Sequence, residues 1–191
     1  EQRSSLSHKG AAPHTLVLSA PPIPRTLALI IYGDLDVSVI DELPPGRQAI
    51  TTKAIGKDKR IDAYRFVKGQ IDKGRQAYVV APLIEDSDAI NVRSAESIYS
   101  ELLRLFRGYT VALLHGNMKQ KEKDDIMERF AAGKIDILVS TVVIEVGINV
   151  QNASVMVIEN SERFGLAQLH QLRGRVGRGN YKSYCILIND S

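Results

Sequence analysis

Several features that often decide the function of a protein are missing from this sequence. Its 191 residues include no tryptophan and one cysteine, Cys185, which excludes an intrachain disulfide and a multi-cysteine metal site. Cys185 lies in an apolar run, which favours a buried thiol over a nucleophile. No apolar run is long enough to span a membrane, and no signal peptide is recognisable. We therefore expect a protein of the reducing cytoplasm.

Three nucleotide-binding signatures are also absent. No Gly-x-x-x-x-Gly-Lys-Ser/Thr loop occurs, so the chain lacks the element that cradles β- and γ-phosphates. No Gly-x-Gly-x-x-Gly follows the first strand, which excludes a Rossmann-type dinucleotide enzyme. No Asp-Glu pair follows a strand to hold magnesium, since Asp41 and Glu42 lie in a connector. A nucleotide would therefore be held largely by another domain.

The residues that are present indicate an ordinary globular protein. Hydrophobic residues make up 44% of the chain and charged residues 25%, which is sufficient for a real core. The formal net charge of +3 gives only weak support for an anionic partner. The chain starts without methionine in a polar segment and stops directly after an apolar run, so we expect a piece of a longer protein.

Short apolar segments alternate with amphipathic ones from residue 49 onward. Runs of Val, Ile and Leu predict strands, and apolar residues at helical spacing predict helices. The expected strands are residues 49–55, 76–81, 110–114, 135–140, 154–158 and 184–188. The expected helices are residues 58–73, 94–106, 119–132 and 165–176, with a polar loop at 85–91. This alternation predicts an α/β fold, a parallel sheet with helices on both faces, although the strand order is not readable.

A change of composition near Pro44 and Pro45 predicts a domain boundary. Residues 1–44 would be the end of a truncated preceding domain with its connector, and residues 45–191 would form one α/β domain. Residues 15–20 have the apolar character of a strand whose sheet would lie in the preceding domain. Because an unpaired apolar strand recruits neighbours, we expect residues 1–40 to pack against another copy or across the domain surface.

Four loops carry polar residues that could serve a ligand, and parallel sheets collect such loops beyond the carboxyl ends of their strands. The first contains His115, Gly116 and Asn117 between a strand and a helix. A helix start offers free N–H groups and a positive dipole to an anion such as a phosphodiester. The alternative is that Asn117 caps the helix and no ligand binds.

The second loop begins with Ser140 and Thr141, whose hydroxyls at a strand end could hold a phosphate of a nucleic-acid strand. Farther along, Gly147 would permit close approach of the backbone, and Asn149 could bond a ribose hydroxyl. Hydroxyls at strand ends are also common caps, so this pattern alone is a weak indication. The third loop, residues 159–165, places polar residues around Phe164.

The fourth loop concentrates arginine beside glycine over residues 171–179. Arg175 and Arg178 are three residues apart, so at the end of a helix they would project from one face. A guanidinium binds phosphate oxygens bidentately, which suits a triphosphate that is losing its γ-phosphate. The alternative is a solvated basic turn. His170, in the preceding helix, is expected to be packed or to cap the helix rather than to act as a base.

Taken together, these loops resemble those of the second motor domain of superfamily-two nucleic-acid helicases. The stretch from Gln171 to Arg178 matches motif VI of that family, and the stretch from Thr141 to Asn149 matches motif V. The loop at His115 matches the motif that touches the nucleic-acid backbone.

The resemblance extends over nearly the whole chain. Residues 19–26 are similar to motif III, except that Pro21 stands where the family usually has threonine. Residues 32–47, 81–85 and 159–170 resemble, in finer detail, the bacterial helicases that drive branch migration. Transcription-repair coupling translocases share residues 164–170 and motif VI and are the nearest rivals.

The resemblance implies a RecA-like domain of the P-loop NTPase type without a phosphate loop of its own. It implies ATP with Mg²⁺ as cofactor, both held mainly by an absent first motor domain of the same chain, and branched or duplex DNA as partner. The complete protein would be a DNA helicase that remodels replication forks and Holliday junctions, associated with the nucleoid in the bacterial cytoplasm. This chain alone would be inactive. The alternative is a non-catalytic α/β module that binds nucleic acid or a protein partner.

The resemblance also assigns roles to single residues. Arg175 and Arg178 would be arginine fingers that face ATP, with Gln171 beside them. Gly147 and Asn149 would border the nucleotide. The residues on the DNA side would be His115, Gly116, Asn117, Ser140 and Thr141.

Overall fold

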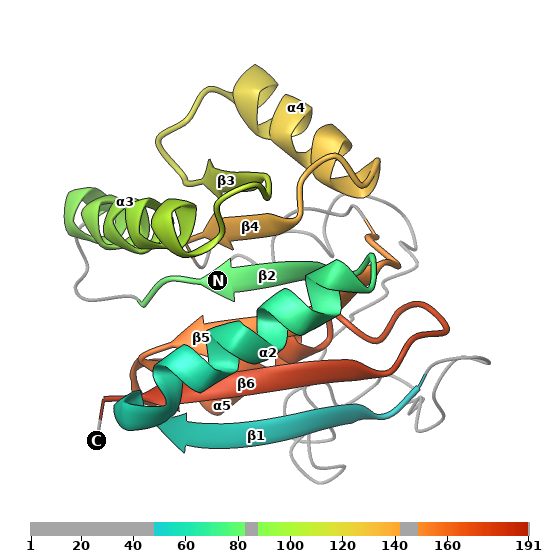
Figure 1. Ribbon diagram of the computed structural model, residues 1–191. Coiled ribbons are helices and arrows are strands. Elements are labelled where there is room, and N and C mark those ends of the chain that lie inside the picture. Colours follow the sequence, from blue (N-terminus) through green and yellow to red (C-terminus); the bar gives the residue numbers. More distant parts are fainter. Residues whose placement is uncertain (1–47, 83–87, 142–148, 191) are drawn as a thin grey trace, which may run out of the picture. The chain divides into compact units, whose positions relative to one another are not determined.

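The computed structural model describes residues 48–82, 88–141 and 149–190 (Figure 1). The strand predicted at residues 15–20, the packing predicted for residues 1–40 and the site residue Gly147 lie outside these ranges. They therefore stay predictions, as does the domain boundary near Pro44.

Strands and helices alternate along the described residues. The strands are β1 (Ile50–Gly56), β2 (Gln76–Val80), β3 (Val111–Leu114), β4 (Ile137–Ser140), β5 (Ala153–Glu159) and β6 (Ser183–Asn189). The helices are α2 (Arg60–Asp72), α3 (Asp88–Leu105), α4 (Gln120–Ala131) and α5 (Leu166–Arg173), with short 3-10 turns η1 (Lys57–Lys59) and η2 (Ser161–Arg163). Each of these strands and α-helices was predicted, and two helix boundaries differ enough to change an interpretation.

The six strands form one sheet in the order β1-β6-β5-β2-β4-β3. All neighbouring strands are parallel, which confirms the predicted fold class. In the register of the sheet, Val80 lies opposite both Ser140 and Ile158, and Leu114 lies opposite Ser140. The carboxyl ends of all six strands therefore meet along one edge, and all six strands begin at the opposite edge. We call these the carboxyl edge and the amino edge.

Helices cover both faces of the sheet (Figure 1). Alternate residues of the central strands divide between two hydrophobic clusters, as the period of two in a strand requires. One cluster joins the sheet to α2 and α3, with Val67 and Leu102 fully buried. The other joins it to α4 and α5, with Phe130 buried against Tyr78 at 5.0 Å between ring centroids. Each helix thus lies on the face that its apolar spacing requires.

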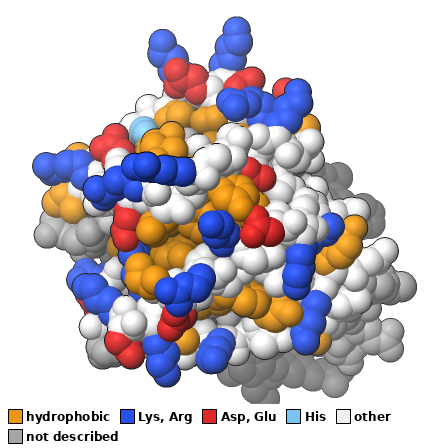
Figure 2. Space-filling model, viewed as in Figure 1, with side chains coloured by type: hydrophobic (Ala, Val, Ile, Leu, Met, Phe, Trp, Pro, Cys, Tyr) orange, Lys and Arg blue, Asp and Glu red, His pale blue; other side chains and the backbone are white. Residues whose placement is uncertain are grey.

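The outer surface of α2 and α3 carries charged side chains with hydrophobic ones between them (Figure 2). Ile61 and Phe66 of α2 and Leu103 of α3 are among the partly exposed apolar residues. None of the helices in the described part of the chain is long and apolar enough to cross a membrane.

Helix α3 begins at Asp88, so the polar loop predicted at residues 85–91 is wrong for its last four residues. The reason is that Asn91, Ala95 and Leu102 are all buried and share a helical spacing that starts before Ser94. Asn91 was taken for a loop residue because it is polar.

Helix α5 ends at Arg173, three residues before the predicted end. Gly174 caps it, and Gly177 has a φ of +74°, a conformation that a right-handed helix cannot contain. Arg175 and Arg178 therefore do not share a helical face, contrary to the prediction. They belong to the irregular segment that leads from α5 to β6.

Candidate functional site

The segment after α5 forms a tight turn, residues 174–178, which we call the arginine turn. The Arg175 N–H donates to the Leu172 carbonyl at 3.0 Å, and the Val176 N–H donates to the Arg173 carbonyl at 3.3 Å. Val176 is fully buried in the cluster below α4 and α5. These bonds and the buried valine fix the backbone from which the two arginines project.

Gly177 and Gly179 allow the arginine turn and the residue after it to pack closely against the rest of the domain. A Cβ at Gly177 would lie 2.8 Å from Ile50 Cγ1, and a Cβ at Gly179 would lie 2.5 Å from the Gln151 carbonyl oxygen. Ile50 begins β1, and Gln151 precedes β5. The arginine turn therefore lies at the amino edge of the sheet. The expectation that all four loops gather at the carboxyl edge is wrong for this loop, because α5 carries the chain back across the sheet before the arginines occur.

The structure nevertheless brings Arg175 and Arg178 together. Arg178 is exposed, and its Nε donates to the Gly174 carbonyl at 3.0 Å, while Arg175 is half-buried. Burial raises the pKa of Tyr78 to about 12, and the positive charges of Arg175 and Arg178 oppose that rise. Both guanidinium groups therefore lie within electrostatic range of one phenol. Gln171, on the last turn of α5, is exposed beside them.

Asn149 lies near the arginine turn. Its neighbour Val150 is buried in the same hydrophobic cluster as Leu172 and Val176, whereas Asn149 itself is exposed. The amino edge thus presents an amide and two guanidinium groups, all of which can bind phosphate or hydroxyl oxygens. Among the described residues no group of three His, Cys, Asp or Glu side chains could hold a metal ion.

The predictions for His170 and Cys185 had different outcomes. His170 is exposed and its Nδ1 lies 3.2 Å from Arg173 Nη2, so the packed alternative is wrong, and the prediction that it caps the helix rather than acts as a base stays a prediction. Cys185 is buried as predicted. Burial raises the pKa of its thiol to about 11, although the charge of Arg173 acts in the opposite direction. An un-ionised, buried thiol is a poor nucleophile.

The other predicted residues lie at the carboxyl edge. Gly116 and Asn117 are exposed in the loop between β3 and α4, and Lys123 Nζ donates to the Gly116 carbonyl at 2.7 Å. The residue that precedes α4 is Lys119, so the alternative in which Asn117 caps this helix is wrong. The backbone of this loop is therefore ordered and open to solvent.

Ser140 and Thr141 adjoin this loop but are buried. The Thr141 N–H donates to the Leu114 carbonyl at 3.3 Å, and only 1% of Ser140 is exposed. Within the described part of the chain, neither Ser140 Oγ nor His115 Nδ1 has a hydrogen-bond partner. Among the described residues, two buried polar atoms at the ends of neighbouring strands therefore find no partner, and such atoms usually have one in native structures.

Sequence reasoning missed a polar network at the carboxyl edge. Arg60 Nε donates to Glu159 Oε1 at 2.8 Å, and the Tyr64 hydroxyl donates to the same oxygen at 2.5 Å. Arg60 also forms a bidentate pair with Glu101, at 2.7 and 3.0 Å. The sequence offered one sign of this network, since Arg60 and Tyr64 are four residues apart on a helix and Glu159 follows an apolar strand.

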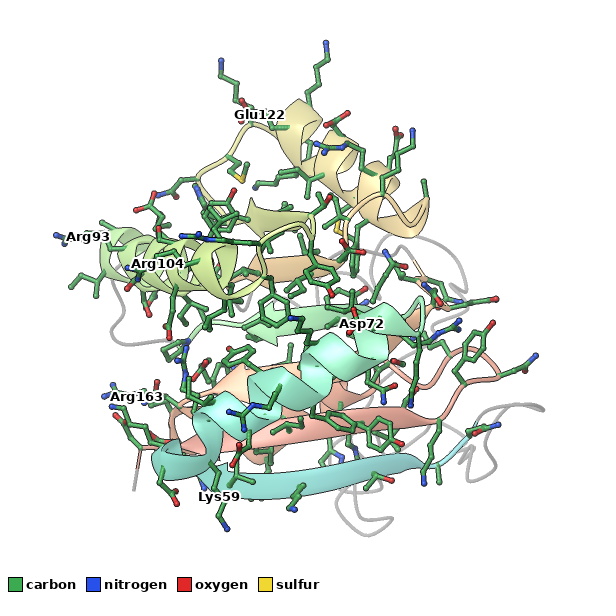
Figure 3. All side chains as sticks on the ribbon, viewed as in Figure 1. Lys59, Asp72, Arg93, Arg104, Glu122 and Arg163 are labelled. Carbon is green, nitrogen blue, oxygen red and sulfur yellow. The ribbon has the colours of Figure 1, made fainter. Side chains whose placement is uncertain are left out.

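The polar groups of this network bond mainly to one another. Burial raises the pKa of Tyr64, and Glu159 raises it further. Burial lowers the pKa of Arg60, but its bonds to Glu101 and Glu159 outweigh this and keep it charged. A cavity of about 420 Å³ lies beside the network, and its lining includes Lys57, Arg163 and Asp190. Figure 3 shows Lys59, Arg93 and Arg163 toward the carboxyl edge and Asp72 near the other end of α2.

Comparisons with known proteins show the family of this chain. A family profile of helicase conserved C-terminal domains matches residues 58–180. The chain is 55% identical over 189 residues to the ATP-dependent DNA helicase RecG of Thermotoga maritima, covering 98% of this chain and 24% of that protein. It is 51% identical over 191 residues to RecG of Bacillus subtilis, covering 100% of this chain and 28% of that protein.

A solved structure described as RecG bound to a three-way DNA junction also resembles this chain. The two superpose with a TM-score of 0.76 at 53% sequence identity, covering 95% of this chain and 24% of the other. The chain thus spans about a quarter of the length of these relatives.

Proposed function

This chain belongs to the family of helicase conserved C-terminal domains, and from that premise we propose that it is the second motor domain of an ATP-dependent DNA helicase. The complete protein would remodel branched DNA, such as replication forks and Holliday junctions, in recombination and repair. The observation that carries the proposal is the arginine turn, which is anchored by Val176 and Gly177 in a chain without a phosphate loop.

Arg175 and Arg178 would contact the γ-phosphate of ATP. Guanidinium forks fit phosphate oxygens, so the donors at the amino edge suit this ligand. Gln171 would lie beside them, and Asn149 and Gly147 would border the ribose. When bound, ATP with Mg²⁺ supplies the phosphoryl group whose transfer drives movement. We propose that both are held mainly by the first motor domain of the same full-length chain, since no metal-binding group occurs in the described residues.

The arginines would act chiefly in the transition state. Charge spreads over the γ-phosphate oxygens as the bond to the leaving group breaks, and a fixed guanidinium stabilises that charge. A rigid backbone favours this role because a pre-positioned donor needs no reorganisation during the reaction. The bonds from Arg175 and Val176 back to α5 provide that rigidity.

Branched or duplex DNA would bind at the carboxyl edge. Gly116 and Asn117 are exposed there, and their backbone N–H groups and amide suit a phosphodiester. His115, Ser140 and Thr141 complete the proposed set, since two of them carry buried polar atoms without a partner in the described part of the chain. The named relatives are bacterial, so we propose a bacterial cytoplasmic protein that associates with the nucleoid through its DNA.

The test compares the full-length protein with this chain alone. We expect the full-length protein to hydrolyse ATP when forked DNA is added, and the isolated 191-residue chain to match a blank without enzyme. DNA-stimulated phosphate release by the isolated chain would contradict the division of the site between two domains. A full-length protein that binds DNA without hydrolysing ATP would instead identify a non-catalytic binding module.

A further inference from the structure

A cation and an aromatic ring stack on each other at the amino edge, a few residues from the arginine turn. Arg75 Cζ lies 3.4 Å from the centroid of the Tyr181 ring, closer than most cation–π pairs. Arg75 directly precedes β2, and Tyr181 shortly precedes β6. Although Arg75 covers one side of the ring, 48% of Tyr181 remains exposed. The other side of the ring therefore faces solvent.

The stacked pair is held by ordered neighbours. Ser183 Oγ donates to the Tyr181 carbonyl at 3.1 Å. On the other side, Asn152 Nδ2 donates to the Gly74 carbonyl at 2.9 Å, which fixes the residue before Arg75. Arg75 Nη2 donates to the Lys73 carbonyl at 3.4 Å, and Nη1 is buried without an acceptor in the described part of the chain, so a backbone carbonyl and the ring together hold the guanidinium. An exposed aromatic face on a fixed support is the arrangement that base stacking requires.

The loop 149–152 links this pair to the arginine turn. Gly179, directly after the turn, packs on the Gln151 carbonyl, and Asn152 bonds to Gly74 beside Arg75. Tyr181 lies three positions after Arg178, so their Cα atoms are at most about 10–11 Å apart for extended backbone. That span is comparable with the distance from the γ-phosphate to the base of a nucleoside triphosphate. Asn149, proposed above to meet the ribose, belongs to the connecting loop.

We infer that Tyr181, supported by Arg75, is a stacking platform for the base of the nucleoside triphosphate whose γ-phosphate meets Arg175 and Arg178. The inference rests on the proposed function and adds a residue that would bind the base. Every base offers a π face, and stacking on an aromatic side chain tolerates all of them. A purine covers more of the ring than a pyrimidine does, so the platform favours purine nucleotides.

The test measures ATP and UTP hydrolysis by the full-length protein on saturating forked DNA. Tyr181→Ala is expected to raise KM for ATP roughly 5- to 100-fold, since stacking on one aromatic residue is worth that much binding. The kcat at saturating ATP should fall far less than KM rises, and KM for UTP should rise less than KM for ATP. Tyr181→Phe keeps the ring and should restore most of the ATP affinity. Phe66→Ala removes a partly exposed aromatic residue from α2 and is the matched control.

Binding of tripolyphosphate, which has no base, provides an independent measurement. Its inhibition constant should be the same for wild type and Tyr181→Ala. Equal losses for ATP and tripolyphosphate, a KM for ATP within about twofold of wild type, or a loss of DNA affinity in place of ATP affinity would each overturn the inference. If Arg178→Ala abolishes turnover while Tyr181→Ala changes nothing, the proposed function stands and only the platform is wrong. If the wild-type protein binds no ATP, both are wrong.

Discussion

The two edges of the sheet differ in how their charged side chains are used. At the carboxyl edge, Arg60 pairs with the buried Glu159 and the partly exposed Glu101, so these charges satisfy one another. At the amino edge, Arg178 is exposed and its Nε bonds to a backbone carbonyl of its own turn. The first arrangement suits stability, because buried charges need partners. The second suits recognition of an anion, because the guanidinium reaches solvent.

The difference also separates the two proposed ligands in space. Nucleotide would meet the amino edge, and DNA would meet the loop of Gly116 and Asn117 at the carboxyl edge. Helix α5 spans the sheet between them, from the loop of Phe164 to the arginine turn. If the proposals are right, substitutions at one edge should change one ligand's binding or turnover and spare the other. The predictions below use this separation, from the largest expected effect to the smallest.

The largest effect is expected from Arg178→Ala in the full-length protein. DNA-stimulated ATP turnover should fall by about 10³–10⁵, because the arginine would stabilise charge that develops only in the transition state. ATP affinity should stay within a few-fold, and Arg175→Ala should behave similarly. Lysine at either position should restore little activity, because a point charge cannot reproduce a planar fork. Steady-state hydrolysis and a separate nucleotide-binding assay distinguish the two effects.

Arg173→Ala is the control for this prediction. Arg173 precedes the capping Gly174 and lies against His170, so its removal should affect turnover much less. Near-normal turnover in Arg178→Ala would favour the alternative, in which the arginine turn is a solvated basic turn without a role in ATP hydrolysis. A loss of turnover that arises only from weak ATP binding would have the same consequence.

The next effect concerns the stability of the carboxyl edge. Arg60→Ala should lower the free energy of unfolding by about 3–5 kcal/mol, because it leaves Glu159 as a buried carboxylate without its cation. Chemical denaturation of the isolated domain measures this. Arg65→Ala is a matched control on the same helix, since 74% of that side chain is exposed and its pair with Asp62 should contribute below about 1 kcal/mol. Equal effects of the two substitutions would show that the network adds no stability.

Sequence patterns predicted the strands and the helices, because each depends on local periodicity. The roles of Arg175 and Arg178 stay predictions. Sequence patterns could not predict the strand order or the Arg60–Glu159 bond, which joins residues 99 positions apart. The edge at which the arginines lie was also predicted wrongly. That error arose because α5 carries the chain back across the sheet before the arginines occur. The predicted shared helical face was a separate error, since backbone conformation at Gly174 and Gly177 ends the helix where the side-chain pattern does not.

A smaller effect is expected from Gly177→Ala at the amino edge. Alanine is strained at a φ of +74°, and its Cβ would displace Ile50, so stability should fall by about 1–3 kcal/mol. ATP turnover should also fall in the full-length protein, because the arginines would be misplaced. Gly69→Ala is the control, since it lies in α2 with nothing within 4 Å and should stabilise by about 0.5–1 kcal/mol. Unchanged thermal denaturation in Gly177→Ala would show that the turn is not fixed.

A weaker effect is expected from acid on the carboxyl edge. The hydrogen bond from Arg60 lowers the pKa of Glu101 below its ordinary value of 4.5. A carboxyl group with a lowered pKa stabilises the fold above its unfolded pKa, and that contribution disappears as the pH falls through the folded pKa. Glu101→Gln should therefore make unfolding less dependent on pH below about 4.5 and leave the amino edge unchanged. Parallel pH profiles of wild type and variant below that value would contradict this assignment.

The smallest effect is expected from Asn117→Ala in the full-length protein. One exposed amide near a phosphate contributes a single hydrogen bond, so affinity for forked DNA should fall only about threefold, with the KM for ATP unchanged. Because the contact would be to the backbone, the loss should be equal for DNA of different sequence. Gln120→Ala, at the exposed first residue of α4, is the control, since Gln120 bonds to Asp124 of its own helix. A change in the KM for ATP with unchanged DNA affinity would reverse the assignment of the two edges, because it would make the carboxyl edge the nucleotide side.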